Sequence, residues 1–287
     1  MEITKNLSTD ELLAKKRKAE KVQKIFVKIF IFFVLIIMDL PIFYLIVNSF
    51  TTARITGTWS GFSFIPYQTL FNYVGNKYAK KIWNAAFNTL LVAVVAGILA
   101  TIVGTSGAIG THYMKRKWLK RTFEVVNQIP VVNAEIVMAI SLCILFVSMN
   151  WPRTFITLVI GHMVLTVPFV VLSVEPKLEQ MDNSLYEAAL DLGATQPQAI
   201  WKVMIPDILP GIISGFLLSV TLSLDDYIVT AFTKPGQGFE TISTYVEAVT
   251  KKESLPIQLR AFTTVLFVIV MLVMFAISMK LRKKDVR

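Results

Sequence analysis

The sequence is short of charge, cysteine and histidine, and each shortage excludes a class of protein. Only 17% of its 287 residues are Asp, Glu, Lys or Arg, whereas about a quarter is typical of soluble domains. Cys143 is the single cysteine, so no disulfide framework and no cysteine-based metal site is expected within the chain. His112 and His162 lie far apart, without the HExxH spacing of zinc enzymes. The Gly-x4-Gly-Lys-Ser/Thr phosphate-binding loop is also missing, so the chain is not expected to hydrolyse nucleotides itself.

Apolar residues, in contrast, are abundant and gathered in long runs. Residues 82–114 contain no Asp, Glu, Lys or Arg, and neither do residues 154–174 or 261–279. About 20 such residues in a helix cross the ~30 Å hydrocarbon layer of a membrane. The gaps between charges predict an all-α membrane protein with six spans, at residues 26–50, 84–111, 124–149, 154–175, 208–232 and 259–280.

The basic residues are divided unequally between the two sides of these spans. The two tails and the loops after spans two and four hold 20 Lys and Arg, against 9 on the other side. Because cytoplasmic segments carry the excess, both termini are expected in the cytoplasm. Topology and contacts with lipid headgroups then explain the net charge of +10, and nucleic-acid binding is not expected. The expected organisation is a basic tail at 1–24, a membrane domain at 25–281 and a short tail at 282–287.

The outer segment at residues 51–83 is rich in aromatic side chains. Amphipathic rings are favoured at the headgroup level of a membrane. The segment is therefore expected to lie along the outer interface, as an aromatic belt without further function.

The largest predicted cytoplasmic loop contains a short helix. Its apolar side chains recur at spacings of three and four, at Leu185, Ala188, Ala189 and Leu192. Gly193 is placed to end this helix in a left-handed conformation. A second helical piece is expected at 196–203, followed by Pro206 and the return to the membrane. The loop at 179–206 is therefore predicted to present a docking helix to the cytoplasm.

The pattern of this loop resembles a known family signature. The loop contains Glu187-Ala188-Ala189, Gly193 four residues later and, after nine more residues, Val203-x-Ile205-Pro206. This pattern is similar to the EAA loop of binding-protein-dependent ABC importer permeases. The resemblance implies a six-span type I importer transmembrane domain, whose coupling helix sits in a groove of an ATPase subunit. The residues that it implies for ATPase coupling are Glu187, Ala188, Ala189, Asp191, Gly193 and Pro206.

The resemblance also implies a set of partners in the cytoplasmic (inner) membrane. They are a homologous second permease subunit, two ATPase subunits that bind ATP and Mg, an extracytoplasmic substrate-binding protein and membrane lipid. No cofactor is implied for this chain, and ATP hydrolysis is expected on the separate subunit.

Other segments resemble the polyamine permeases of this family. These segments are Gly61-Phe62-Ser63-Phe64 with Tyr67, Leu222-Ser223-Leu224-Asp225-Asp226-Tyr227 and Thr241-Ile242-Ser243-Thr244-Tyr245. They imply transport of spermidine or putrescine and a polyamine-binding protein as the extracytoplasmic partner. Pro256-Ile257-Gln258-Leu259-Arg260 departs from the Pro-x-hydrophobic-Asn-Ala expected before the last span. Permeases for iron, sulfate and other small solutes share parts of the pattern, so a different solute remains the alternative.

Carboxylates inside the predicted spans are candidates for the substrate pathway. A carboxylate in hydrocarbon is costly, so it normally faces a cavity or a partner. A polyamine offers ammonium groups on apolar spacers, which carboxylates and aromatic rings would complement. The candidate pathway residues are Asp225, Asp226, Tyr227, Asp39, Glu135 and Ser223. For Asp225 and Asp226 the alternative is structural, as a hydrated helix end that caps the loop at 233–257; Asp39 and Glu135 are alternatively neutralising or capping residues.

Two further features have structural interpretations. Small residues on the second span, at Ala93, Gly97, Thr101, Gly104 and Ala108, predict a helix-packing seam. His162 is expected to satisfy a hydrogen bond that faces the helix bundle.

Two other functional classes compete with the importer. A secondary transporter would use Asp39, Glu135 and Asp225 as an ion relay, but the six spans show no inverted repeat and the docking loop would have no task. A membrane-embedded enzyme lacks a metal-binding or nucleophile constellation in the sequence.

Overall fold

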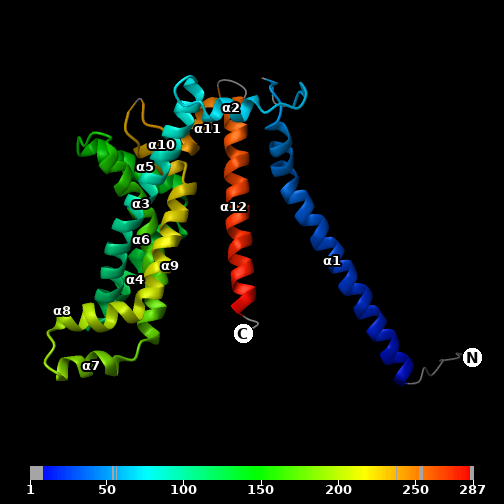
Figure 1. Ribbon diagram of the computed structural model, residues 1–287. Helices are drawn as coiled ribbons and strands as arrows, with labels where there is room; N and C mark the ends of the chain where they lie inside the picture. Colours follow the sequence, from blue (N-terminus) through cyan, green and yellow to red (C-terminus); the bar gives the residue numbers. More distant parts are fainter. Residues whose placement is uncertain (1–8, 54, 56, 237, 252–254, 285–287) are drawn as a thin grey trace, which may run out of the picture. The chain divides into compact units, whose positions relative to one another are not determined.

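The computed structural model shows a chain of helices joined by loops (Figure 1), and it describes residues 9–53, 55, 57–236, 238–251 and 255–284. No strand occurs among these residues, so the all-α prediction is confirmed. The helices form two compact units. One joins the chain before Ala79 to the last helix, and the other holds the helices between them.

The first unit contains two long apolar helices, α1 (Thr9–Asn48) and α12 (Ile257–Lys284), and the short α2 (Ile65–Phe71). From Ile25 to Met38, α1 exposes large apolar side chains around its whole circumference. A helix that is apolar all round belongs in lipid or against other protein.

Aromatic rings hold the loop after α1 together. Phe50 stacks on Phe62 with ring centroids 5.1 Å apart, and it also contacts Tyr67 at 5.2 Å. The Tyr67 hydroxyl is hydrogen-bonded to the Ser49 hydroxyl at 2.6 Å. The predicted aromatic segment is thus a packed cluster, and its position at a membrane interface stays a prediction.

Arg260, which departs from the family pattern, fastens the same loop to the start of α12. Its side chain is buried and donates hydrogen bonds to the carbonyl oxygens of Ala53 (3.1 Å) and Leu255 (2.9 Å). A buried guanidinium needs such acceptors because burial without them is costly. The departure at 256–260 therefore has a structural role within this unit.

The second unit packs α3 (Lys77–His112), α6 (Phe155–Gln180) and α9 (Ile205–Asp225) around a buried apolar core. Small residues allow the close approach. A Cβ on Gly104 of α3 would come within 2.8 Å of Val170 of α6. The predicted seam on the second span is confirmed as a packing surface, with Thr101 half-buried and four members buried: Ala93, Gly97, Gly104 and Ala108.

The predicted third span, at 124–149, is wrong as a continuous helix. The chain forms α4 (Lys117–Val132) and α5 (Glu135–Ser148), with a bend of 108° between them. Asn133 and Ala134 between them have extended ψ angles of 148° and 131°. An uncharged run of residues shows that a segment is apolar, but it does not show whether the helix is straight or bent.

The predicted fifth span, at 208–232, is also divided. The helix ends at Asp225, and the separate α10 (Ile228–Thr233) begins after two residues. The carboxylate of Asp226 stops one helix from continuing into the next because it binds backbone N–H groups of α10.

Among the described residues, four helical stretches are long and apolar enough to cross a membrane: Gln23–Asn48, Lys77–His112, Phe155–Gln180 and Gln196–Asp225. The bent pair of α4 and α5 makes a fifth if it is one span, and Ile257–Leu272 is a shorter apolar helix. Within the second unit, α7 (Asn183–Asp191) and α8 (Gln196–Ala199) lie at one end, while α5, α10 and α11 (Ile242–Thr250) lie at the other (Figure 1).

Candidate functional site

The docking helix predicted from the sequence is α7, and capping chemistry sets both of its ends. At the start, the Asp182 carboxylate accepts a hydrogen bond from the N–H of Ser184 at 2.9 Å, as an N-cap does. This contact holds the pKa of Asp182 below its ordinary value. At the end, Gly193 has a φ of 87°, and the N–H of Ala194 donates to the carbonyl of Ala189 at 3.0 Å. The predicted left-handed end at Gly193 is confirmed.

The second helical piece of the loop is also confirmed, with a change of helix type. α8 passes into the π-helix η1 (Ile200–Met204), which continues into α9. Thr195 and Gln198 form a reciprocal capping box at the start of α8, with the N–H of Thr195 donating to Oε1 of Gln198 at 3.0 Å. Pro206 follows this π-helical turn within the continuous helical stretch Gln196–Asp225, and because proline has no N–H it donates no hydrogen bond to the preceding turn.

One face of α7 is attached to the helices behind it. Tyr186 packs against the buried cluster that contains Leu178, Met181 and Met204. Its ring also lies 5.3 Å from the ring of Tyr113, just past the end of α3. Partial burial is the main cause of a raised pKa for the Tyr113 hydroxyl, with smaller effects of Tyr186 and Glu187. The docking helix is therefore connected to α3, α6 and η1.

The other face of α7 is open. Leu192 is 89% exposed and Leu185 is 53% exposed. Most residues predicted for ATPase coupling are also exposed in this loop: Glu187, Ala188, Asp191 and Gly193 are exposed, Ala189 is half-buried, and Pro206 is exposed at the start of α9. An exposed apolar patch with a charged rim is typical of a surface that another protein covers.

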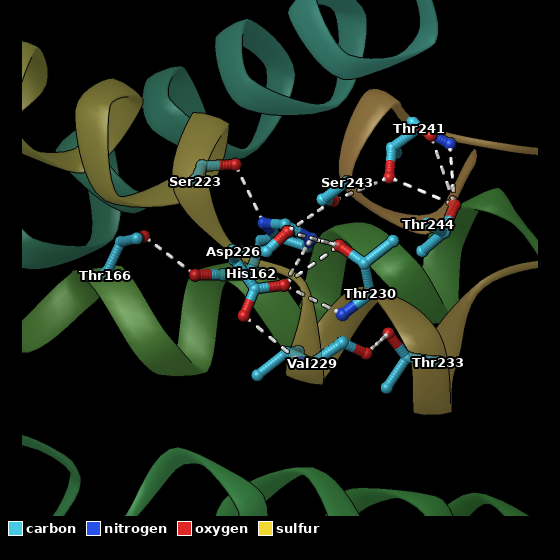
Figure 2. A network of polar contacts seen from close by, with 10 residues as sticks. All are labelled: His162, Thr166, Ser223, Asp226, Val229, Thr230, Thr233, Thr241, Ser243 and Thr244. Atoms are coloured by element: carbon cyan, nitrogen blue, oxygen red, sulfur yellow. Dashed lines mark hydrogen bonds and ion pairs between the residues drawn. The ribbon is translucent and has the colours of Figure 1, made fainter. Parts of the chain in front are cut away.

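A second candidate site lies at the opposite end of the unit, where buried polar side chains meet (Figure 2). We call His162, Ser223, Asp226 and Thr230 the outer network. They come from α6, the last turn of α9, the residue after α9, and α10. Their exposed fractions are 1%, 3%, 6% and 1%. The prediction that His162 makes a bundle-facing hydrogen bond is confirmed.

Asp226 caps α10 through both of its carboxylate oxygens. Oδ1 accepts the N–H of Val229 at 3.1 Å, and Oδ2 accepts the N–H of Thr230 at 2.8 Å. The Thr230 hydroxyl donates to Oδ2 at 2.9 Å, and Nε2 of His162 lies 3.6 Å from the same oxygen. The Asp226 backbone carbonyl accepts from the Ser243 hydroxyl at 3.0 Å, which ties α11 to the junction. Asp226 thus has a structural contact set, but it differs from the alternative considered above, because its carboxylate is buried and caps α10 instead of being hydrated at the loop 233–257.

Asp225 and Tyr227, on either side of Asp226, have different surroundings. Asp225 is exposed at the end of α9. The hydroxyl of Tyr227 hydrogen-bonds to Glu247 of α11, and partial desolvation followed by this contact raises the pKa of Tyr227. Glu247 also pairs with Lys251, and that pairing is the main reason why the pKa of Glu247 is lowered. Charged and phenolic side chains thus follow the end of α9, with Asp225 exposed and Tyr227 paired to Glu247.

The remaining predicted pathway residues lie elsewhere. Ser223 belongs to the outer network, where its hydroxyl contacts Nδ1 of His162 at 2.7 Å. Glu135 is exposed in the first turn of α5, at the bend with α4. Asp39 is exposed on α1, two residues before Pro41, in the other unit.

Sequence reasoning missed Thr230 and the contacts that fix the loop before α11. Glu240 accepts hydrogen bonds from Lys234 (2.7 Å) and Thr244 (2.6 Å) through Oε2. Its carbonyl also accepts a bond from the side-chain amide of Asn88 on α3 at 2.9 Å. The spacing of Asp226 before Val229 and Thr230 is an N-cap signal that could have identified α10 from the sequence.

Comparison with protein families gives one match over most of the chain. Residues 102–287 match the model of the binding-protein-dependent transport system inner membrane component. The spermidine/putrescine transport system permease protein PotC of Haemophilus influenzae is 32% identical over 240 residues, which cover 84% of this chain and 90% of that protein. The putrescine transport system permease protein PotI of Escherichia coli K12 is 30% identical over 208 residues, 70% of this chain and 72% of its own.

Comparison with solved structures supports the same fold. A bacterial ABC transporter involved in the import of the acidic polysaccharide alginate contains a chain that superposes with a TM-score of 0.66 at 15% identity, covering 91% of this chain and 96% of its own. The MetNI methionine ABC transporter in an inward-facing conformation gives a TM-score of 0.56 at 18% identity, covering 68% of this chain and 92% of its own. At these identities the likeness concerns the fold alone, and it confirms the predicted importer fold.

Proposed function

The chain belongs to the family of binding-protein-dependent transport system inner membrane components, and from that membership we propose that it is the permease subunit of an ATP-driven polyamine importer. It is a multi-pass membrane protein of such a transport system. One observation carries the substrate: relatives named as spermidine/putrescine permeases align over most of both chains.

The open face of α7 supports coupling to a separate ATPase. Leu185 and Leu192 would lie in a groove of that subunit, with Glu187 and Asp191 at the rim. Movement of the ATPase would reach α6 and α3 through Tyr186, whose contacts tie α7 to both helices. Nucleotide binding and hydrolysis would therefore change access at the far ends of these helices.

The exposed carboxylate at the outer end of α9 supports a cationic substrate. Asp225 would pair with an ammonium group, and the ring of Tyr227 would contact the methylene spacer or the cation face-on. Ser223 and Asp226 would shape this end of the pathway from within the outer network. Asp39 and Glu135 would line the path if the assembled transporter covers them.

The importer that we propose has further subunits and a defined orientation. A homologous second permease would complete the pathway, two ATPase subunits would carry ATP and Mg, and an extracytoplasmic binding protein would deliver the polyamine. Both termini would face the cytoplasm, in agreement with the distribution of Lys and Arg.

Radiolabelled uptake into proteoliposomes tests this function. The vesicles would hold the chain with its co-purifying subunits, with the binding protein outside and ATP inside. We expect ATP-dependent uptake of spermidine or putrescine and none without ATP. Uptake of sulfate or ferric iron, without polyamine uptake, would contradict the proposed substrate. Polyamine uptake by this chain alone, driven by an ion gradient, would contradict an ATP-driven importer.

A further inference from the structure

The polarity of the hydrogen bonds in the outer network defines the state of the His162 ring. The Thr230 hydroxyl has one proton, and Asp226 takes it, either at Oδ2 (2.9 Å) or at the backbone carbonyl (3.4 Å). The oxygen of Thr230 must then accept from the imidazole, whose Nε2 lies 2.9 Å away. The ring therefore carries a proton on Nε2.

The other ring nitrogen completes the chain of bonds. Nδ1 of a neutral Nε2–H imidazole is an acceptor, and the Ser223 hydroxyl lies 2.7 Å from it. The bonds then run in one direction, from Ser223 through His162 and Thr230 to the carboxylate of Asp226. Every link in this series is buried, so a wrong tautomer would leave a polar atom without a partner.

The same bonds connect three helices at the outer end of the unit. His162 is on α6, Ser223 is on α9 and Thr230 is on α10. Figure 2 shows the imidazole between the other two side chains, with the carboxylate of Asp226 beside Thr230. The ring thus links the last turn of α9 to α10.

We propose that His162 is a positioning residue that acts through its Nε2–H tautomer. Through Thr230 it orients Asp226 as the cap of α10, so that both oxygens of this carboxylate are used inside the protein. Asp225, which is exposed one residue earlier, is then the carboxylate presented to a cation. The role of Asp225 toward a cation rests on the proposed function, whereas the tautomer of His162 does not.

Nitrogen NMR of the full-length protein tests the tautomer directly. The chain has two histidines, so His112→Gln leaves His162 as the single imidazole for ¹⁵N-histidine labelling. We expect a protonated Nε2 and an unprotonated Nδ1. Thr230→Val should change the Nε2 signal, whereas Thr166→Val should not, because the Thr166 hydroxyl donates to the backbone carbonyl of His162 (2.8 Å) and not to its ring. An Nδ1–H tautomer would overturn the proposal.

Uptake kinetics of three variants test the positioning role. Gln can donate from the position of Nε2, Asn can accept near the position of Nδ1, and Leu can do neither. We expect His162→Leu to lower the maximal rate about tenfold and His162→Gln to lower it by no more than about threefold, as loss or retention of a buried hydrogen bond implies. His162→Asn should have a lower maximal rate than His162→Gln, because the hydrogen bond to Thr230, which orients Asp226, requires a donor at the position of Nε2.

The split between KM and maximal rate separates positioning from substrate contact. The His162 variants should keep the KM for polyamine, whereas Asp225→Asn should raise it. A raised KM in His162→Gln, or better transport by His162→Asn than by His162→Gln, would overturn the positioning role. If no polyamine is transported at all, the proposed function fails while the NMR result still decides the tautomer.

Discussion

Gly193 shows how a single residue directs the docking helix. Its φ of 87° lies in the left-handed region, and a Cβ added there would meet no atom within 4 Å. The need for glycine at this position is therefore conformational and not steric. A side chain would add about 1–2 kcal/mol of backbone strain, and asparagine would add less because it tolerates this conformation.

We accordingly expect ATP-driven uptake to fall in the order wild type, Gly193→Asn, Gly193→Ala, and to be lost in Gly193→Arg, while membrane insertion is retained. The measurement is uptake in proteoliposomes at matched protein levels. Gly110→Ala is the control, because Gly110 is also open to solvent but has an ordinary helical φ. Equal effects of Gly193→Ala and Gly110→Ala would show that the left-handed end of α7 is not needed.

At the scale of the element, one face of α7 packs against other helices of this chain, and the other face is exposed. Tyr186 anchors it to a buried cluster, whereas Leu192 at its C-terminal end is 89% exposed. The length of α7, nine residues, is too short for an isolated helix to be stable in water. Its caps and its anchored face therefore hold it in place for a partner.

The open face leads to a second expected outcome. Leu192→Glu places a charge in the apolar contact, and we expect at least about a tenfold loss of ATPase subunit bound to the purified chain. Expression and insertion should be unchanged because Leu192 is 89% exposed. Val74→Glu, at a 95% exposed position between α2 and α3, is the matched control and should bind the ATPase normally. Normal ATPase binding by Leu192→Glu would remove α7 from the interface.

At the scale of the whole molecule, the placement of the two candidate sites agrees with a transporter. α7 lies at one end of the second unit and the outer network lies at the other, with α6 and α9 running between them (Figure 1). Events at one end can reach the other because these helices pack closely: a Cβ on Gly215 of α9 would lie 3.2 Å from Val170 of α6.

Membrane orientation gives a prediction at the same scale. In a Cys143→Ala background, Lys16→Cys should react with an impermeant thiol reagent only when the cytoplasmic side is open. Val74→Cys should react from the outside, because one span separates the two positions and the basic residues place the first of them in the cytoplasm. Both side chains are exposed in the structure. The reverse pattern of labelling would invert the proposed topology.

Local sequence determined a large part of this protein. The uncharged runs specify membrane helices because few other structures satisfy the backbone in hydrocarbon, and the order of small, apolar and glycine residues specifies α7 and its left-handed end. The family resemblance rests on the same short segment, where neighbouring residues suffice to define the motif.

Only the tertiary structure decided the bend between α4 and α5 and the different fates of Asp225 and Asp226. Asp225 is exposed, whereas Asp226 is buried and lies beside His162 of α6, which is 64 residues away in the chain. Burial and hydrogen bonding between distant segments depend on how helices pack, and no local pattern encodes that packing.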